Sequence, residues 1–269
     1  MDREKKKRLK ERIRQYVRQD VMVAFSGGTD SSLLLKMVCE AAQETGKEVY
    51  GVTVQTRLHP VEEIRKAAQT VQETGARHLV VMVDELMEAG IGQNPVDRCY
   101  LCKKCLFDKI KKTAADRGIS MIMDGTNEDD LHVYRPGLRA LKELGIISPL
   151  AEEKVTKAEV RELAEEYGLS VASKPAMPCL ATRFPYGTAL TYEKLEKVEK
   201  GEAFIRKLGF YNLRLRIHGD IARIEVDEQE IAKILQHREE IIRYLRQLGY
   251  SYVTLDLEGF RSGSMDEVL

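Results

Sequence analysis

The first part of the chain alternates short apolar runs with longer amphipathic stretches. Apolar runs of about four to eight residues bounded by turn residues are typical of buried strands. Four runs fit that description and are predicted strands: 21–25, 49–56, 78–86 and 119–127. The stretches around them are predicted helices: 3–19, about 31–45, and 61–75 with Pro60 at its start and Gly75 at its end.

Strands that alternate with helices predict a doubly wound parallel α/β sheet, because parallel strands are joined by right-handed helical crossovers. Ligands of such sheets bind at the carboxyl ends of the strands. The turns that follow Phe25 and Met123 both lie at that end, so we expect them to face one pocket. A further helix is predicted over 155–169, where Thr156 and Glu159 form a capping box.

A proline-rich stretch at 173–187 precedes a change of pattern. Long loops in compact domains commonly carry function, so this loop is a candidate for chemistry. The elements predicted beyond it lack the βα repeat: helices 192–208 and 228–247, and strands 213–217, 221–226 and 251–257. The sequence therefore predicts two domains, an α/β domain at 1–185 and a smaller α+β domain at 186–269 for substrate binding or oligomerisation.

Two of the later strands place arginines on one side. The leucines of LRLRI face one way and Arg214 and Arg216 the other, while IARIEV places Arg223 and Glu225 opposite its apolar positions. Antiparallel sheets commonly leave one side wet, so an exposed polar face explains the pattern. A bidentate grip on a phosphate or carboxylate, which arginine suits better than lysine, explains it equally well.

The first predicted strand runs into the sequence Ser-Gly-Gly-x-Asp-Ser-Ser. Gly27 and Gly28 let the backbone approach a ligand closely, Ser26, Ser31 and Ser32 add hydroxyl donors, and the following helix favours an anion at its start. The chain lacks the Gly-Lys-Ser/Thr of a Walker loop and the G-x-G-x-x-G of a dinucleotide fold. The pattern therefore favours a phosphate site of another class, although a merely capped helix has similar residues.

Composition narrows the setting of this chemistry. The chain has 43 Lys and Arg against 43 Asp and Glu, so no overall field would draw it onto nucleic acid, and only a local patch stays open. No apolar run approaches the ~20 residues of a membrane span. The charged start MDREKKKRLKERIRQ lacks the apolar core of a signal peptide. We therefore expect a soluble protein in the reducing cytoplasm.

Three of the five cysteines lie close together, which in a reducing compartment argues against disulfides and for metal binding or catalysis. Cys99 and Cys102 form a C-x-x-C pair, and Cys105 would lie ~9 Å from Cys99 along a continuous helix. A third thiolate from the long loop, Cys179, is therefore easier to bring to the pair. Three thiolates suit an iron–sulfur cluster with an open iron and four suit zinc, and redox chemistry or coincidence also stays open. Cys39, within an apolar helix, is predicted to be a small buried residue.

Four segments together resemble the LarE family of PP-loop ATP pyrophosphatases over nearly the whole chain: SGGTDSS, DGTNEDDLHVYRPG, CLATRFPYGT and VTLDLEGFRSG. That family consists of ATP-dependent sulfur transferases that build the nickel-pincer nucleotide cofactor of lactate racemase. The resemblance implies that ATP adenylates a carboxylate of pyridinium-3,5-biscarboxylic acid mononucleotide, with release of pyrophosphate. AMP then leaves as the carboxylate becomes a thiocarboxylate.

The resemblance also implies residue roles. The glycine loop holds pyrophosphate, and Mg²⁺ offsets the phosphate charge with Asp30 as its nearest partner. The nucleotide-contacting residues that it implies are Ser26, Gly27, Gly28, Asp30, Ser31, Ser32, Asp124, Gly125 and Arg183. Taken singly, Glu128, Asp129 and Asp130 of the same segment are more typical of solvated carboxylates in a capped turn than of ligands. Arg214 and Arg216 match positions that hold the phosphate of the substrate nucleotide, in agreement with the arginine face described above.

Sulfur delivery differs between two branches of the family. In one, a cysteine at the place of Cys179 gives up its own sulfur and becomes dehydroalanine. In the other, Cys99, Cys102 and Cys179 bind a [4Fe-4S] cluster whose free iron carries an extra sulfide. The C-x-x-C pair favours the cluster branch, and Cys105 departs from the family pattern. Glu202 matches an acidic position near the sulfur site. The catalytic residues that the resemblance implies are Cys179, Asp30 and Glu202.

Two other functions stay open. PP-loop tRNA thiolases also adenylate and add sulfur, but they need an RNA-binding surface, and this neutral chain shows no basic stripe. An ATP-sensing or zinc-stabilised interaction module would release no pyrophosphate. We expect a small nucleotide substrate, no nucleic-acid or membrane partner and, from the family, a homo-oligomer.

Overall fold

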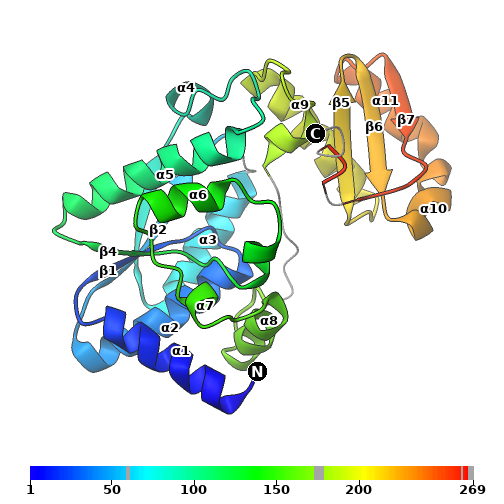
Figure 1. Ribbon diagram of the computed structural model, residues 1–269. Helices are drawn as coiled ribbons and strands as arrows, with labels where there is room; N and C mark the ends of the chain where they lie inside the picture. Colours follow the sequence, from blue (N-terminus) through cyan, green and yellow to red (C-terminus); the bar gives the residue numbers. More distant parts are fainter. Residues whose placement is uncertain (59–60, 173–178, 262, 266–269) are drawn as a thin grey trace. The chain divides into compact units, whose positions relative to one another are not determined.

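The computed structural model describes residues 1–58, 61–172, 179–261 and 263–265 (Figure 1). Pro60, predicted to begin a helix, and residues 173–178 of the predicted loop lie outside them. The chain forms two compact units: unit 1 comprises Met1–Gly90 and Asp97–Met177, and unit 2 comprises Ile91–Val96 and Pro178–Leu269. Division into domains at 185/186 stays a prediction, and residues 179–185 pack with unit 2.

The short segment Ile91–Val96 joins unit 2 through backbone and amide contacts. Asn94 is buried, and its side-chain amide donates to the carbonyls of Phe184 and Pro185 at 3.1 and 2.8 Å. The Leu190 amide donates to the Gly92 carbonyl at 2.7 Å. These contacts tie the loop after Cys179 to a distant part of the chain.

Unit 1 is built on a four-stranded parallel sheet, which confirms the predicted α/β fold. The strand order is β3-β2-β1-β4, with bounds Val49–Gln55 for β2, Val21–Ala24 for β1, Arg77–Met82 for β3 and Met121–Met123 for β4. Val21 pairs with Val49 on one side and with Met121 on the other. The order reverses between β1 and β4, and in open α/β sheets this switch point is where ligands bind.

Helices cover both faces of this sheet (Figure 1). One face packs on α1, α2, α3 and α8, which span Arg3–Tyr16, Thr29–Thr45, Val61–Thr74 and Lys157–Glu166. The other packs on α5 and α6, which span Arg98–Ala115 and Gly137–Glu143. Val21 and Val23 belong to the first core and Met22 to the second, so β1 is apolar throughout because both of its faces are buried. Short helices complete the unit: α4 (Glu85–Glu88), α7 (Pro149–Glu152) and η1 (Asp129–His132).

Two strands are shorter in the structure than the sequence predicts. The run at 78–86 is not buried throughout: β3 ends at Met82 and forms an edge of the sheet, with 47% of Val80 and 74% of Met82 exposed. The run at 119–127 forms a strand only over β4, because the Asp124 amide turns to the Ile147 carbonyl at 2.9 Å. The apolar runs correctly predicted that both strands exist but not where they end.

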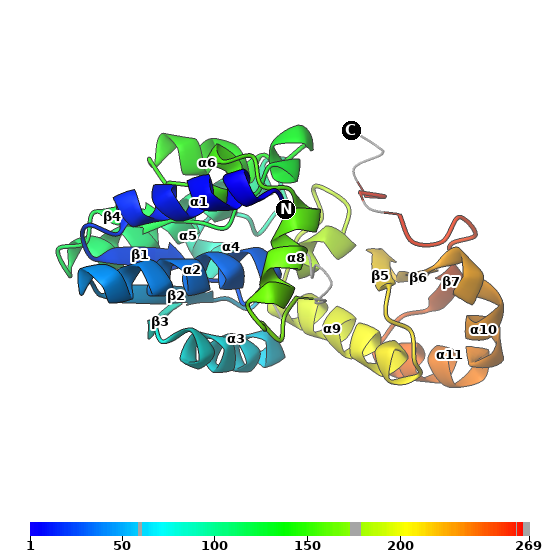
Figure 2. The same cartoon turned by 90° about the horizontal axis from the view of Figure 1, so that it is seen from below.

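Unit 2 has a three-stranded sheet in the order β5-β6-β7, with bounds Leu213–His218, Ile221–Val226 and Tyr252–Leu255. β5 and β6 are antiparallel, and β6 and β7 are parallel. Helices α9 and α11, which span Tyr192–Lys207 and Arg238–Gln247, lie on one side of the sheet, and the C-terminal segment lies on the other (Figure 2). A Cβ on Gly201 of α9 would lie 2.7 Å from a methyl of Leu215, so this helix packs closely on β5.

The predicted helix 228–247 is broken. It consists of η3 (Glu228–Glu230), α10 (Ile231–Gln236) and α11, with His237 between the last two. The His237 amide closes α10 on the Ile234 carbonyl at 3.1 Å, and its ring lies edge-on to Phe210 with centroids 5.9 Å apart. This tertiary contact holds the break, which the helical periodicity did not indicate.

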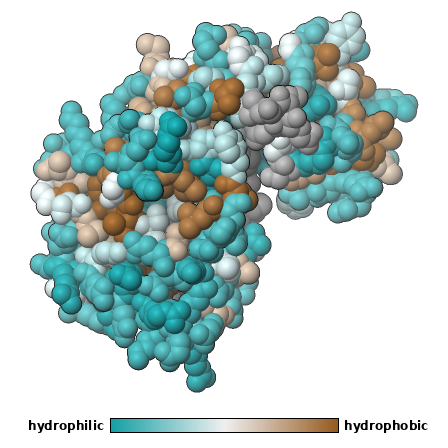
Figure 3. All heavy atoms as spheres, in the orientation of Figure 1, coloured by the Kyte–Doolittle hydropathy of each residue, from teal (hydrophilic) through white to brown (hydrophobic). Residues whose placement is uncertain are grey.

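Polar side chains cover most of the surface seen in Figure 3, in keeping with the balanced acidic and basic content. Within the described ranges, no helix is both long enough and apolar enough to cross a membrane.

The capping box predicted at α8 is present and generates a test. The Thr156 hydroxyl accepts from the Glu159 amide at 3.3 Å, and a Glu159 carboxylate oxygen accepts from the Thr156 amide at 2.9 Å. Thr156→Ala should lower the free energy of unfolding by about 1 kcal/mol. Thr113→Ala is the matched control, because that hydroxyl only donates back to the Lys109 carbonyl within α5. Urea denaturation of both variants measures the difference, and equal losses would contradict the capping role.

Candidate active site

The glycine turn between β1 and α2 leaves the start of a 17-residue helix open to a ligand. Gly27 has φ +70°, and a Cβ there would lie 3.1 Å from the Cβ of Ala67, so a side chain is excluded on two grounds. Gly28 is the N-cap of α2 and offers no side-chain cap. The first amides of α2 therefore remain available to an anion.

The loop hydroxyls differ in what they contact. The Ser26 and Ser31 hydroxyl oxygens lie 3.2 Å apart, and Ser26 is exposed. The Ser32 hydroxyl is fully buried and donates to the Gly28 carbonyl at 2.8 Å. The Ser31 side chain is also buried, and its hydroxyl donates to the Gly28 carbonyl at 3.2 Å. Of the three serines, only Ser26 is exposed, while Ser31 and Ser32 brace the loop.

The second predicted loop lies against the first. A Cβ on Gly125 would lie 2.8 Å from the Ser31 amide nitrogen, so the two backbones are in contact. Asp124 is buried, and its carboxylate accepts from the hydroxyls of Thr126 and Ser148 at 2.6 and 2.5 Å. The turns after β1 and β4 therefore lie side by side, and that they face one pocket stays a prediction.

Asp30, in the first turn of α2, lies in a small charged network. Its carboxylate pairs with the Lys157 ammonium and accepts from the Asn127 amide at 2.9 Å. Lys157 begins α8 and comes from 127 residues along the chain. Sequence reasoning missed Lys157 and Asn127, because nothing local to either residue indicates Asp30 as its partner.

Cys99, Cys102 and Cys105 all lie on α5, a single continuous helix. Cys99 is exposed and Cys102 is partly exposed. Lys103, one helical turn after Cys99, brings its ammonium to 3.8 Å from the Asp124 carboxylate. The first turns of α5 therefore lie beside the second loop.

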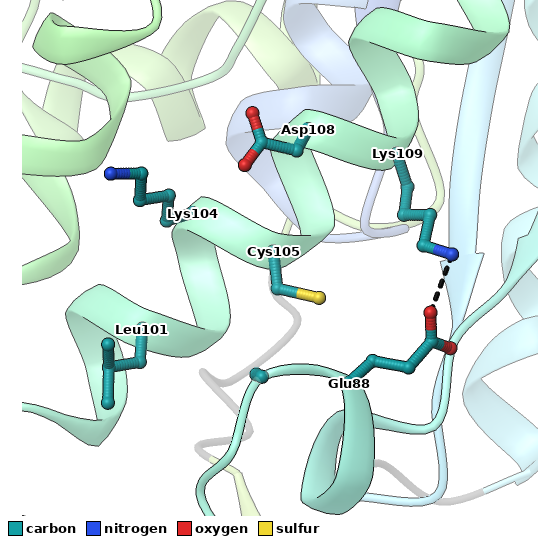
Figure 4. Close-up of a pocket in the computed structure, with 7 residues that line it drawn as sticks. Glu88, Leu101, Lys104, Cys105, Asp108 and Lys109 are labelled. Carbon is teal, nitrogen blue, oxygen red and sulfur yellow. Dashed lines mark ion pairs between the residues drawn. The ribbon is translucent and has the colours of Figure 1, made fainter.

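Cys105 has different surroundings. It lines a shallow cavity of about 300 Å³ between α4 and α5, where its sulfur points toward the Glu88–Lys109 ion pair (Figure 4). Burial, with the Glu88 carboxylate adding to it, raises the pKa of the Cys105 thiol. Since a metal ligand must be a thiolate, this raised pKa disfavours Cys105 as a ligand. Cys39 is buried as predicted, and desolvation raises its pKa to about 11.

In unit 2, Cys179 begins the short helix η2, which spans Leu180–Arg183. Its sulfur accepts from the Ala181 amide at 3.4 Å, and its carbonyl accepts from the Arg183 guanidinium at 3.1 Å. Arg183 is buried and grips the Glu202 carboxylate through two bonds of 2.8 and 3.0 Å. Glu202 therefore holds the backbone of Cys179 through Arg183.

Glu202 is itself an organising charge. It is buried in α9 and also pairs with Arg206, a residue that sequence reasoning missed although it lies one helical turn away. Burial alone would raise the pKa of Glu202, but Arg183 and Arg206 hold it below its usual range. The carboxylate also accepts from the Leu215 amide at 3.1 Å, which ties α9 to β5.

The predicted arginine face exists, but it is not wet. In the register of β5 and β6, Arg214 lies opposite Glu225 and Arg216 lies opposite Arg223, so all four residues share one face of the sheet. Glu225 is fully buried, and Arg216 is 4% exposed. The Arg216 guanidinium donates to the Glu225 carboxylate at 3.0 Å and to the Thr182 carbonyl at 3.0 Å. The exposed-face explanation is therefore wrong, and the face is joined to the Cys179 loop.

Arg214 is the exception on this face. It is 9% exposed and donates to its neighbour's carbonyl, that of Leu213, at 2.7 Å. Among the residues that the structure describes, no carboxylate forms an ion pair with it. Burial, with Arg183 and Arg216 adding like charge, lowers the pKa of Arg214 to about 10. The Glu202 carboxylate opposes this shift only in part. A buried guanidinium without a carboxylate in direct contact favours an anion beside it.

This glycine–serine loop at the switch point of a parallel sheet defines a PP-loop nucleotide-binding protein, and residues 1–132 match the model of the PP-loop domain. The chain is 41% identical over 251 residues to pyridinium-3,5-bisthiocarboxylic acid mononucleotide synthase of Lactiplantibacillus plantarum, covering 93% of this chain and 90% of that one. It is 38% identical over 263 residues to an uncharacterized protein of Synechocystis, covering 96% and 97% of the two chains. The chain belongs to the LarE family of ATP-dependent sulfur transferases.

A more distant similarity connects the chain to another sulfur-inserting enzyme. The tRNA-specific 2-thiouridylase MnmA of Rickettsia bellii is 27% identical over 195 residues, covering 58% of this chain and 51% of that one.

The contact between the two loops of unit 1 can be tested at Gly125. Gly125→Ala should weaken ATP binding at least about tenfold, because the new methyl group would push the second loop away from the Ser31 amide. Gly137→Ala is the matched control, since a Cβ there would meet only ordinary contacts at 3.4 Å and beyond. Calorimetric titration of both variants with ATP measures the effect, and unchanged affinity in Gly125→Ala would contradict the geometry.

Proposed function

We propose that this protein adenylates a carboxylate of pyridinium-3,5-biscarboxylic acid mononucleotide and converts it to a thiocarboxylate. A carboxylate oxygen of the substrate attacks the α-phosphorus of ATP, and pyrophosphate leaves. A sulfur nucleophile then attacks the acyl carbon, and AMP leaves with the carboxylate oxygen. The observation that carries this proposal is the 41% identity, over nearly the whole chain, to a synthase named for the bisthiocarboxylic product.

The geometry of unit 1 supports the first step. The amides at the start of α2, with the exposed hydroxyl of Ser26, suit the leaving pyrophosphate. Lys157, which pairs with Asp30, is the cation that would move to a phosphate oxygen when ATP binds. Asp30 uses part of its hydrogen-bonding capacity on Lys157 and Asn127, so an oxygen lone pair remains with which it would hold Mg²⁺. When bound, Mg²⁺ would offset the charge of the phosphates.

The sulfur step rests on Cys179 and on α5. Cys99 and Cys102 follow each other by three residues on one helix, so their side chains lie on one face and suit two ligands of a [4Fe-4S] cluster. We propose Cys179 as the third ligand. When bound, such a cluster would supply an iron without a protein ligand to carry the transferred sulfide. The alternative is that Cys179 gives up its own sulfur, and in both schemes Glu202 and Arg183 position its backbone.

The arginine face supports the choice of substrate. Arg214, which forms no ion pair with a described carboxylate, would bind the phosphate of a nucleotide, and Arg216 lies two residues away on the same face of β5. A tRNA thiolase is the second candidate, favoured by the similarity to MnmA. The equal numbers of acidic and basic residues argue against it, because RNA binding depends on basic surface. We further propose that the enzyme acts as a homo-oligomer in a reducing cytoplasm.

Cys179→Ala separates the two chemical steps. Pyrophosphate should still be released in the presence of the mononucleotide, because adenylation uses unit 1, while thiocarboxylate formation falls at least about a hundredfold. Cys105→Ala, at the thiol with the raised pKa, is the control and should keep both steps. Pyrophosphate is measured by a coupled assay and the thiocarboxylate by mass spectrometry. Undiminished thiocarboxylate in Cys179→Ala would refute the assigned role.

Iron content separates the two sulfur schemes. Wild-type protein prepared without oxygen and reconstituted should hold about four iron and four acid-labile sulfide per chain. Cys99→Ala should lose most of both, whereas Cys105→Ala should keep them. Colourless, iron-free wild-type protein after reconstitution would favour the single-use cysteine. Equal losses in the two variants would place Cys105 in the ligand set.

A further inference from the structure

The C-terminal segment that follows β7 is held against the arginine face of unit 2. The Asp256 amide donates to the Ile224 carbonyl at 2.9 Å, and the Phe260 amide donates to the Val226 carbonyl at 2.7 Å. Gly259 between them has φ +69°, and a Cβ there would lie 2.8 Å from the Val226 carbonyl oxygen. This segment lies across the sheet from α9 and α11 (Figure 2).

Two of the three arginines on the face pair with carboxylates, one from β6 and one from the C-terminal segment. The Ser264 hydroxyl is buried and donates to the Glu225 carboxylate at 2.8 Å. The same carboxylate pairs with Arg216 at 2.9 Å and with Arg223 at 3.1 Å. Asp256 adds a second carboxylate at 3.4 Å from Arg223. Both arginines thus have their charge compensated by the protein itself.

Arg214 contacts an aromatic ring, whereas Arg216 and Arg223 contact a carboxylate. Its guanidinium carbon lies 4.9 Å from the centroid of the Phe260 ring. A ring at this distance attracts and orients a guanidinium, but it adds no negative charge. The Phe260 ring therefore orients the N–H donors of Arg214 without neutralising its positive charge, which can still attract an anion.

We infer that Phe260 is a positioning residue for the phosphate of the nucleotide substrate, acting through Arg214. This inference rests on the proposed function, because the mononucleotide supplies the phosphate. A carboxylate at the place of Phe260 would neutralise Arg214 and compete with a phosphate for it. A plain aliphatic side chain would leave the guanidinium free to take other rotamers, at a cost in affinity when the phosphate binds.

The consequence is selectivity for a phosphorylated ligand. The phosphate monoester of the mononucleotide gains the contact with Arg214, whereas the dephosphorylated nucleoside cannot. Loss of the Phe260 ring should therefore reduce affinity for the nucleotide alone. If Phe260 had only a structural role, its loss would lower the affinity for the nucleotide and for the nucleoside equally.

The test compares Phe260→Leu and Phe260→Tyr with the wild-type enzyme. Calorimetric titration measures the Kd of pyridinium-3,5-biscarboxylic acid mononucleotide and of its dephosphorylated nucleoside. Phe260→Leu should raise the Kd of the nucleotide about five- to thirtyfold and leave that of the nucleoside unchanged, while Phe260→Tyr stays within about threefold of wild type. In turnover, KM for the nucleotide should rise more than kcat falls.

Phe204→Leu is the matched control. Phe204 also belongs to unit 2 but stacks on Tyr244, with centroids 4.1 Å apart, so the same substitution should leave the phosphate preference unchanged. Should Phe260→Leu not fold, Phe260→Met, which fills similar volume without a ring, carries the same expectation.

The outcomes distinguish this inference from the proposed function. Wild-type enzyme that releases pyrophosphate with the mononucleotide, combined with an intact phosphate preference in Phe260→Leu, would overturn the inference alone. Wild-type enzyme that neither prefers the phosphorylated ligand nor turns it over would overturn both.

Discussion

The pairing of β1 with β2 on one side and β4 on the other is the constraint on which unit 1 depends. Because all three strands are parallel, the loops that follow β1 and β4 leave the same edge of the sheet side by side. Their separation is then so small that Gly125 has no room for a side chain next to the Ser31 amide. One register of apolar strands thus brings the start of α2 next to the loop that follows Asp124.

Unit 2 is organised by buried charge. Glu202 and Glu225 are both buried, and each is surrounded by arginines: Arg183 and Arg206 for the first, Arg216 and Arg223 for the second. A buried carboxylate without such partners would strongly destabilise the fold. Each carboxylate therefore fixes the orientation of the arginines that contact it. The ion pair of Glu202 with Arg183 positions the backbone of Cys179. The ion pairs of Glu225 hold the other charged side chains of the sheet face to which Arg214 belongs.

The two units therefore contribute different chemistry. In the proposed reaction, unit 1 would bind the phosphates of ATP through the amides of α2, Ser26 and Lys157. Unit 2 would supply the Cys179 thiol and the Arg214 guanidinium for the phosphate of the substrate. The three cysteines on α5 belong to unit 1, and the burial of Cys105 distinguishes it from the more exposed Cys99.

The sequence by itself determined the elements whose signals are local. Apolar runs marked the parallel strands, the Thr156–Glu159 spacing marked the start of α8, and strand alternation placed Arg214, Arg216 and Arg223 on one face. Only the tertiary structure decided which partners these residues have: Lys157 for Asp30 across 127 residues, Glu225 for Arg216, and Phe260 for Arg214. It also decided the break at His237 and the exposed edge at β3. The reason is that periodicity records which face of an element is apolar, whereas ion pairs, buried charges and strand ends depend on residues that folding brings from elsewhere in the chain.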